Sequence, residues 1–283
     1  MPTIMQFRPI TLDDKSLFDK YLGNFPQNAS ELTFTNLFAW RKAKKHEFTE
    51  IDSHLLVKTG SFYYQPIGAS PSKIIRKIID KESKAVFERV EKKIAQQLEG
   101  LKTKEQRGMF DYVYRISDLT ELKGNKFEPK RNLIKQCEKY QPEVCMLNEG
   151  NIHEFFQLQK KWCSLKSCEE NKPLQHENEA ITETLNNFRE FKLLGICIRK
   201  EDAVAGFAIG EQLNNNVFVE HFEKGDTMFK GIYQYVLKEF VKAIPSHFKY
   251  LNREQDLGIP GIRKAKESYY PVKLVEKYRV SSE

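Results

Sequence analysis

The chain has 283 residues, 40% of them hydrophobic, and a formal net charge of +7. This length suits one large domain or two of ordinary size, and 20 Phe with 12 Tyr supply enough apolar surface to exclude a largely disordered protein. The basic balance favours anionic partners such as nucleic acid, phosphorylated cofactors or lipid headgroups.

The first elements of the chain alternate between strand and helix. Residues 4–10 predict a strand, and Thr11 is a good N-cap for a helix that begins at Leu12. A second helix is expected within residues 30–39, where apolar residues recur at helical spacing. Short β-rich segments separated by turn residues then predict an antiparallel meander, at 46–51, 54–58 and 61–65.

A long stretch of helical periodicity follows. Isoleucines from Ile74 to Ile79 recur at helical spacing, and apolar residues from Val86 to Leu98 continue the pattern up to a possible C-cap at Gly100. Residues 109–116 then predict a strand. Residues 121–139 carry six Lys or Arg against three Glu and predict a basic helix that links two halves.

The second half repeats most of this order. It predicts a strand, two helices, three strands, a long helix and a last strand, at 144–148, 151–165, 176–188, 193–200, 203–213, 217–224, 230–244 and 247–252. FDYVYRISDL (110–119) and FKYLNREQDL (248–257) share five of ten positions. These parallels favour a tandem α/β repeat.

Two motifs carry a family resemblance. LKGNKFEPKRNLIK (122–135) and DLGIPGIRKAKESYYPVK (256–273) resemble the family of the C-terminal domain of phosphatidylglycerol lysyltransferase, which is related to the Fem aminoacyltransferases. The order of elements also resembles the GNAT acyltransferase fold used twice. The resemblance implies an α/β (α+β) fold class with two tandem GNAT-like lobes, each a mixed, mostly antiparallel sheet flanked by helices. The expected parts are an N-terminal lobe (1–120), the basic linking helix (121–142) and a C-terminal lobe with the presumed site (143–283).

The same resemblance implies an activity. It is the transfer of an acyl or aminoacyl group, from aminoacyl-tRNA or a CoA thioester, to an amine or hydroxyl of a small molecule, lipid headgroup or peptide. CoA or acyl-CoA would then be a co-substrate, and no covalently bound cofactor is expected. The alternatives are a CoA-dependent N-acetyltransferase and a non-catalytic module that binds tRNA or an anionic surface through the same basic groups.

Acyl transfer needs a proton acceptor for the nucleophile and a proton donor for the leaving group. In GNAT-like enzymes an acid on the fourth strand often serves as base, which makes Glu220 the first candidate and Glu223 the second. Strand alternation predicts that these two side chains point to opposite faces of the sheet. His221 is more typical of a structural or surface position, and Tyr269 is a candidate phenol donor.

The donor's phosphates are expected at the turn before the long helix, because a helix N-terminus attracts anions. By resemblance to GNAT proteins, Gly225, Lys230 and Gly231 are the candidates, although the family's glycine pattern is degenerate and an ordinary turn is the alternative. Arg263 and Lys266 share a face of the last helix and are expected to neutralise phosphate, unless that face is only solvated.

Polar residues at the end of the last strand predict substrate contacts, because α/β sheets bind ligands at strand ends. Asn252, Arg253 and Glu254 are the candidates there, and Arg253 could instead pair with Asp256. In the linking helix, Arg131 and Lys135 are spaced to contact one nucleic-acid backbone or lipid headgroup. The alternative is that both lie on a solvated helix face.

The remaining polar residues predict no metal chemistry. The six His are scattered without ligand spacing, so no metal is expected. The five Cys form no CxxC pair and are interpreted as reduced, mostly buried thiols of an intracellular protein. No stretch approaches the length of a membrane span, and the expected location is cytoplasmic.

Overall fold

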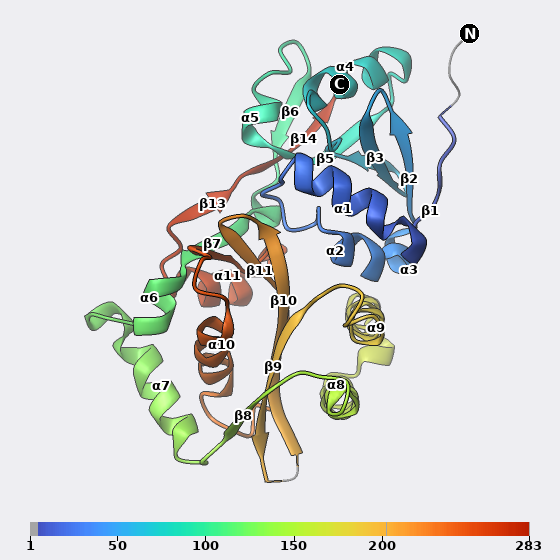
Figure 1. Ribbon diagram of the computed structural model, residues 1–283. Helices are drawn as coiled ribbons and strands as arrows, with labels where there is room; N and C mark the ends of the chain where they lie inside the picture. Colours follow the sequence, from blue (N-terminus) through green and yellow to red (C-terminus); the bar gives the residue numbers. More distant parts are fainter. Residues whose placement is uncertain (1–4, 202, 283) are drawn as a thin grey trace. The chain divides into compact units, whose positions relative to one another are not determined.

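The computed structural model describes residues 5–201 and 203–282 and divides into two compact units (Figure 1). Unit 1 comprises Met1–Tyr112, Glu254–Ala265 and Lys273–Glu283, and unit 2 comprises Val113–Arg253 and Lys266–Val272. Each contains a mixed, mostly antiparallel sheet flanked by helices, which confirms the predicted fold class.

The sheet of unit 1 consists of a meander followed by a parallel strand. In sheet order its strands are β1 (Arg8–Pro9), β2 (His46–Ile51), β3 (His54–Thr59), β4 (Phe62–Tyr64), β5 (Val86–Glu91), β14 (Lys277–Ser281) and β6 (Lys102–Glu105). The β4 and β5 strands are parallel, and the other neighbours for which a register is known are antiparallel. A short strand, β13 (Lys273–Val275), precedes β14.

Helices flank this sheet. They are η1 (Leu12–Asp14), α1 (Lys15–Asn24), α2 (Phe34–Ala39), α3 (Arg41–Lys44), α4 (Pro71–Lys81), α5 (Lys92–Ala95) and η2 (Arg107–Met109). The helix α11 (Pro260–Glu267) begins in unit 1, and its residues from Lys266 on belong to unit 2. The predicted cap is confirmed, because the Thr11 backbone N–H donates to the Asp14 carboxylate at 2.8 Å. The isoleucines of α4 form one buried cluster with Phe87, Val90 and Val280 of the sheet.

The prediction that helical structure continues through residues 86–98 is wrong. Val86–Glu91 is the strand β5, and only Lys92–Ala95 is helical. Phe87 lies opposite Tyr63 of β4 on one side and Val280 of β14 on the other. Pairing on both sides therefore overrides the local apolar spacing, which fits a buried strand as well as a helix.

The sheet of unit 2 is also mixed and mostly antiparallel. Among the described residues this sheet has seven strands, of which β13 is the first and the others are, in sheet order, β7 (Asp111–Arg115, which enters unit 2 at Val113), β12 (Tyr250–Asn252), β11 (Val217–Gly225), β10 (Ala203–Asn214), β9 (Leu194–Lys200) and β8 (Glu143–Met146). The β11 and β12 strands are parallel, and the other pairs for which a register is known are antiparallel.

Helices cover both faces of this sheet (Figure 1). They are α6 (Ile116–Glu121), η3 (Asn125–Phe127), α7 (Glu128–Glu138), α8 (Ile152–Leu165), η4 (Cys168–Glu170), α9 (Lys172–Asn186) and α10 (Ile232–Ala243). On the α8 side Phe155 packs on Phe207 at 5.2 Å between ring centroids, and on the α10 side Phe218 packs on Phe240 at 6.1 Å. Within residues 5–201 and 203–282, no helix has the length and apolar character needed to cross a bilayer.

Each sheet is completed by a strand from the opposite half of the sequence. The β7 strand pairs with β12 in unit 2, where Tyr114 lies opposite Leu251. The β14 strand, near the C-terminus, pairs with β5 and β6 in unit 1. The two segments that share five positions in the sequence, 110–119 and 248–257, therefore contain strands that lie side by side in one sheet.

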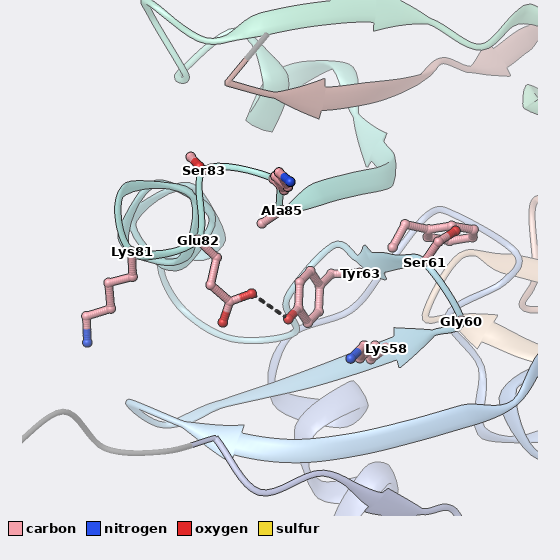
Figure 2. A pocket seen from close by; sticks show the side chains of 10 residues that line it. Lys58, Gly60, Ser61, Tyr63, Lys81, Glu82, Ser83 and Ala85 are labelled. Atoms are coloured by element: carbon pink, nitrogen blue, oxygen red, sulfur yellow. Dashed lines mark hydrogen bonds between the residues drawn. The ribbon is translucent and has the colours of Figure 1, made fainter.

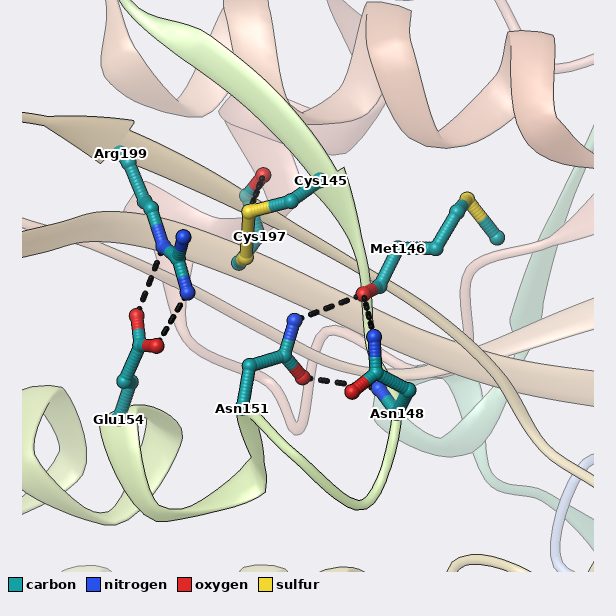
Figure 3. The surroundings of a disulfide bond; sticks show 7 residues. All are labelled: Cys145, Met146, Asn148, Asn151, Glu154, Cys197 and Arg199. Atoms are coloured by element: carbon teal, nitrogen blue, oxygen red, sulfur yellow. Dashed lines mark hydrogen bonds and ion pairs between the residues drawn. A yellow bond between two sulfur atoms is a disulfide. The ribbon is translucent and has the colours of Figure 1, made fainter.

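The expectation of reduced thiols is wrong for four of the five cysteines. Cys145 of β8 lies directly opposite Cys197 of β9, with a Cα–Cα distance of 5.2 Å, and the two form a disulfide (Figure 3). Cys163 and Cys168 form a second disulfide at the end of α8, with a Cα–Cα distance of 5.0 Å. Cys137 is free and buried. Strand register and a helix end bring these pairs together, and neither is visible as a CxxC spacing.

Candidate active site

A β-bulge lies in β11 at the position of the predicted catalytic acids. Ile209 of β10 lies opposite Phe222, but the next residue, Gly210, lies opposite Glu220. His221 is therefore an extra residue in β11. Such bulges re-aim side chains and are over-represented near active sites.

The bulge depends on a glycine across from it. A Cβ atom at Gly210 would lie 2.1 Å from the Val219 carbonyl oxygen, a distance that real Cβ atoms do not reach. The GFAIGE sequence therefore needs glycine at this position so that β10 and β11 can approach each other.

Arg253 joins the two glutamates in one buried cluster. Its Nε lies 2.5 Å from Glu220 Oε2, and its Nη2 lies 2.5 Å from Glu223 Oε2. The three side chains are 12%, 4% and 13% exposed respectively. The prediction that Glu220 and Glu223 point to opposite faces is wrong, because the extra residue between them shifts the alternation by one.

The cluster contains two carboxyl groups and one guanidinium. Burial, together with the neighbouring Glu220 charge, raises the pKa of Glu223 to about 8 against the opposing effect of Arg253. Glu220 Oε1 is buried and has no hydrogen-bond partner among the described residues. Near neutral pH Glu223 is therefore protonated, and Glu220 Oε1 is placed to accept a hydrogen bond.

This arrangement predicts a pH-dependent stability that Glu223→Gln removes. The folded protein keeps the Glu223 proton up to about pH 8, whereas the unfolded chain releases it near 4.5. The resulting stability is complete below the unfolded pKa and is lost as the pH rises through the folded one. Burial raises the pKa of Asp111 to about 6 and lowers that of His46 from 6.5 to about 4, so both affect stability mainly below pH 7, and most of the change between pH 6 and pH 8 reports on Glu223.

Wild-type protein should lose on the order of 2 kcal/mol of unfolding free energy across that window, and Glu223→Gln should lose much less. Denaturant titrations at several pH values measure this. Glu154→Gln is the matched control, because Glu154 of α8 also pairs with an arginine, Arg199, at 2.8 Å (Figure 3). A wild-type slope that persists in Glu223→Gln would show that Glu223 is ionised in the folded protein.

Cationic and aromatic side chains of unit 2 surround Arg253. The Arg253 guanidinium lies 5.5 Å from the ring centroid of Tyr269, and Lys130 Nζ lies 4.3 Å from the same ring. Lys266 Nζ donates to the Arg253 carbonyl, and the Tyr114 hydroxyl donates to the Lys266 carbonyl at 2.8 Å. Burial raises the pKa of Tyr269, so its phenol stays protonated and is able to donate.

The other candidates at the strand end lie apart from this cluster. Asn252 is fully buried in unit 2. Glu254 belongs to unit 1, where its carboxylate accepts from Asn36 Nδ2 at 3.1 Å. The alternative pairing of Arg253 with Asp256 is wrong, because Asp256 also belongs to unit 1 and pairs there with Arg263.

Arg263 is held by a fully buried carboxylate. Its Nε donates to Asp256 Oδ2 at 2.7 Å and its Nη2 to Asp256 Oδ1 at 3.1 Å. Burial alone would raise the pKa of Asp256, but the hydrogen bonds from Arg263 and Tyr112 keep it at about 2. Most of the Arg263 charge is therefore balanced within unit 1. Arg263 and Lys266 share a helix but contact different groups.

The glycines of the predicted phosphate turn are explained by packing. Gly231 is the N-cap of α10 with φ of 88°, and a Cβ there would lie 2.0 Å from the Leu133 carbonyl oxygen. Gly225 ends β11, and a Cβ there would lie 2.9 Å from the Ile232 side chain. Both positions need glycine without any ligand.

An acidic side chain occupies the same turn. Asp226 is buried, pairs with Lys161 at 2.6 Å and accepts from the Met228 backbone N–H at 3.0 Å. The backbone N–H of Phe229 donates to the Asp226 carbonyl at 3.0 Å. Lys230 is exposed. A carboxylate here disfavours a bound pyrophosphate, which supports the interpretation as an ordinary turn.

The two candidates of the linking helix have different environments. Arg131 Nη1 donates to the Leu122 carbonyl at 2.5 Å and to the Gly124 carbonyl at 2.7 Å, so it fixes the loop before α7. Lys135 is exposed on α7. Sequence reasoning missed Lys130 and Tyr114 as neighbours of the cluster, although Lys130 lies within the 122–135 motif. Among the described residues, no group of His, Cys, Asp and Glu is arranged to hold a metal.

Comparisons with solved structures agree with this fold. A conserved protein of unknown function from Bacteroides thetaiotaomicron is 32% identical, with a TM-score of 0.91 over 98% of this chain and 99% of that one. The C-terminal domain assigned to a lysylphosphatidylglycerol synthetase from Agrobacterium fabrum is 11% identical, with a TM-score of 0.67 over 96% and 92%. The second similarity is one of fold alone.

The sequence comparisons define the family. An uncharacterized protein of Mycoplasmoides gallisepticum is 25% identical over 176 residues, which are 60% of this chain and 55% of that relative. The sequence model of the family "Phosphatidylglycerol lysyltransferase, C-terminal" matches residues 23–281. This confirms the resemblance seen in the two motifs, and the chain belongs to the family of the C-terminal domain of phosphatidylglycerol lysyltransferase.

Proposed function

We propose that the chain is an aminoacyltransferase that moves an aminoacyl group from aminoacyl-tRNA to an amine or hydroxyl acceptor. The observation that carries this proposal is the buried, unpartnered Glu220 Oε1 beside the protonated carboxyl of Glu223. One group is ready to accept a proton and the other to donate one, as acyl transfer requires. Arg253 keeps both in place.

In the proposed reaction Glu220 accepts one proton and Glu223 donates one. The acceptor's nitrogen or oxygen attacks the ester carbonyl carbon of the aminoacyl group and gives its proton to Glu220, directly or through water. As the ester bond to the ribose breaks, the ribose oxygen takes the proton of Glu223. A proton then returns from Glu220 to Glu223, which lie on the same guanidinium. Tyr269 is a second donor for the leaving oxygen.

Two observations favour aminoacyl-tRNA over acyl-CoA as donor. Asp226 occupies the turn where a GNAT enzyme would hold pyrophosphate, and the glycines of that turn are needed for packing. The family is also named for a lysyltransferase, an enzyme that transfers an aminoacyl group. Lys130, Lys135 and Lys266 of unit 2 are the cations that we assign to the tRNA acceptor end.

Binding and turnover test this proposal together. Aminoacyl-tRNA at 100 times its dissociation constant should stabilise the protein by about 2.7 kcal/mol, whereas CoA and acetyl-CoA should produce no shift. Turnover is followed as radiolabelled amino acid that leaves charged tRNA for phosphatidylglycerol vesicles, small amines or peptides. Stabilisation by CoA would contradict the assigned donor. Stabilisation by tRNA without transfer to any acceptor would indicate the non-catalytic module.

A further inference from the structure

A second candidate site lies in unit 1, which contains none of the residues assigned to transfer. It is a pocket of about 460 Å³ between the β3–β4 hairpin and the turn that joins α4 to β5 (Figure 2). Its lining residues are Lys58, Gly60, Ser61, Phe62, Tyr63, Lys81, Glu82, Ser83, Lys84 and Ala85. Known ligand pockets have volumes of roughly 300–1,000 Å³, so a nucleotide-sized molecule fits.

The charge of the lining is positive. Three lysines and one glutamate give a net charge of +2. Among the described residues, Lys58, Lys81 and Lys84 form no ion pair. Glu82 accepts a hydrogen bond from the Tyr63 hydroxyl at 3.0 Å, and burial together with Glu82 raises the pKa of Tyr63 to about 12. Glu82 is thus hydrogen-bonded to a neutral phenol and, in the part of the chain that the structure describes, forms no ion pair with the three lysines of the pocket.

The dipole of α4 accounts for the position of only one of these lysines. Lys81 lies in the last turn of α4, where a cation is favourable for the helix dipole. Lys58 comes from β3 on the opposite wall, and its Nζ lies 6.0 Å from the ring centroid of Tyr63 and 5.6 Å from that of Phe7. Cations on both walls, with the hydroxyls of Ser61 and Ser83, are complementary to a phosphate group.

We propose that this pocket binds the phosphate of a phosphate ester, supplied either by a free nucleotide or by RNA. The lysines supply the charge, the serine hydroxyls supply further donors, and Phe62 beside the pocket offers a ring for a base to stack on. This assignment does not depend on the proposed transferase activity, because its residues belong to unit 1 and those of the glutamate cluster belong to unit 2.

Calorimetric titration of the whole chain with sodium pyrophosphate tests the pocket. Lys81→Gln/Lys84→Gln should weaken binding about tenfold, since it removes two charge-assisted contacts. Lys73→Gln/Lys93→Gln is the matched control, because it removes two exposed lysines of α4 and α5 that do not line the pocket. All three proteins should have similar melting temperatures without ligand, because the four lysines are exposed and only the small helix-dipole contribution of Lys81 is lost.

Competition then identifies the source of the phosphate. Displacement of pyrophosphate by AMP supports a free nucleotide, and displacement by a short single-stranded RNA but not by AMP supports RNA. Wild-type protein that fails to bind pyrophosphate at millimolar concentration would overturn the proposal. So would a control variant that weakens binding as much as the pocket variant, since the effect would then reflect net charge alone.

Discussion

Glu220→Gln should lower the rate of aminoacyl transfer by about a hundredfold to ten-thousandfold, the usual contribution of a general base. Glutamine has the shape of glutamate, and its side-chain oxygen still accepts from Arg253 Nε, but it cannot take a proton from the acceptor. The loss should appear in kcat, because the ground-state contacts of the donor are unchanged. Single-turnover transfer of labelled amino acid measures the chemical step.

The control separates catalysis from structure. Glu154→Gln alters a glutamate–arginine pair in the same unit and should leave the rate unchanged. Binding of tRNA, measured by filter retention, should be the same in both variants and the wild type. If Glu220→Gln transfers at the wild-type rate, Glu220 is not the base. If it loses tRNA binding and transfer in equal measure, the cluster serves binding and not chemistry.

Local sequence patterns predicted those elements that carry their own signals. The meander of β2, β3 and β4 follows from short apolar runs between turn residues, and α4 follows from its isoleucine spacing. The strand β5 was missed because its partners, β4 and β14, are distant in sequence. The completion of each sheet by a strand from the other half was not visible either, since apolar alternation does not identify a partner.

The candidate site was predictable in its residue types but not in its geometry. A charged strand end at Arg253 and acids near Glu220 stand out in the sequence, because a packed core rarely includes them. Their contact depends on the bulge at His221, which is a property of how β10 and β11 pair. Arg253 pairs with Glu220 and Asp256 pairs with Arg263, instead of with each other, because Arg253 and Asp256 belong to different units.

Unit 1 contains a buried charge cluster built across the whole length of the chain. Lys277 Nζ of β14 lies 2.5 Å from Glu31 Oε2 and 2.6 Å from Asp111 Oδ1. The Ser30 backbone N–H also donates to Asp111 at 2.8 Å. Lys277 and Asp111 are fully buried, and Glu31 is nearly so. Arg89 Nε also lies 3.1 Å from Glu31 Oε1, so Lys277 is the cation that the two buried carboxylates share and Arg89 is a second cation for Glu31.

Lys277→Ala should destabilise the protein by about 3–5 kcal/mol, because it leaves Asp111 without this cation in a low-dielectric interior and Glu31 with Arg89 as its remaining cation. The midpoint of denaturant unfolding measures this effect, and Lys264→Ala, which removes an exposed lysine of α11, should change it little. Lys277→Ala with Glu31→Gln and Asp111→Asn should recover part of the loss, since it also removes the uncompensated charge.

The triple variant decides which feature of Lys277 matters. Partial recovery would mean that the energy lies in unpaired charge, so that β14 is held in unit 1 by electrostatic pairing as well as by its hydrogen bonds to β5 and β6. No recovery would mean that the packing of the lysine's methylene chain is what holds β14. A single variant as stable as the wild type would contradict both interpretations, because neither the lost ion pairs nor the lost packing of Lys277 would then cost stability.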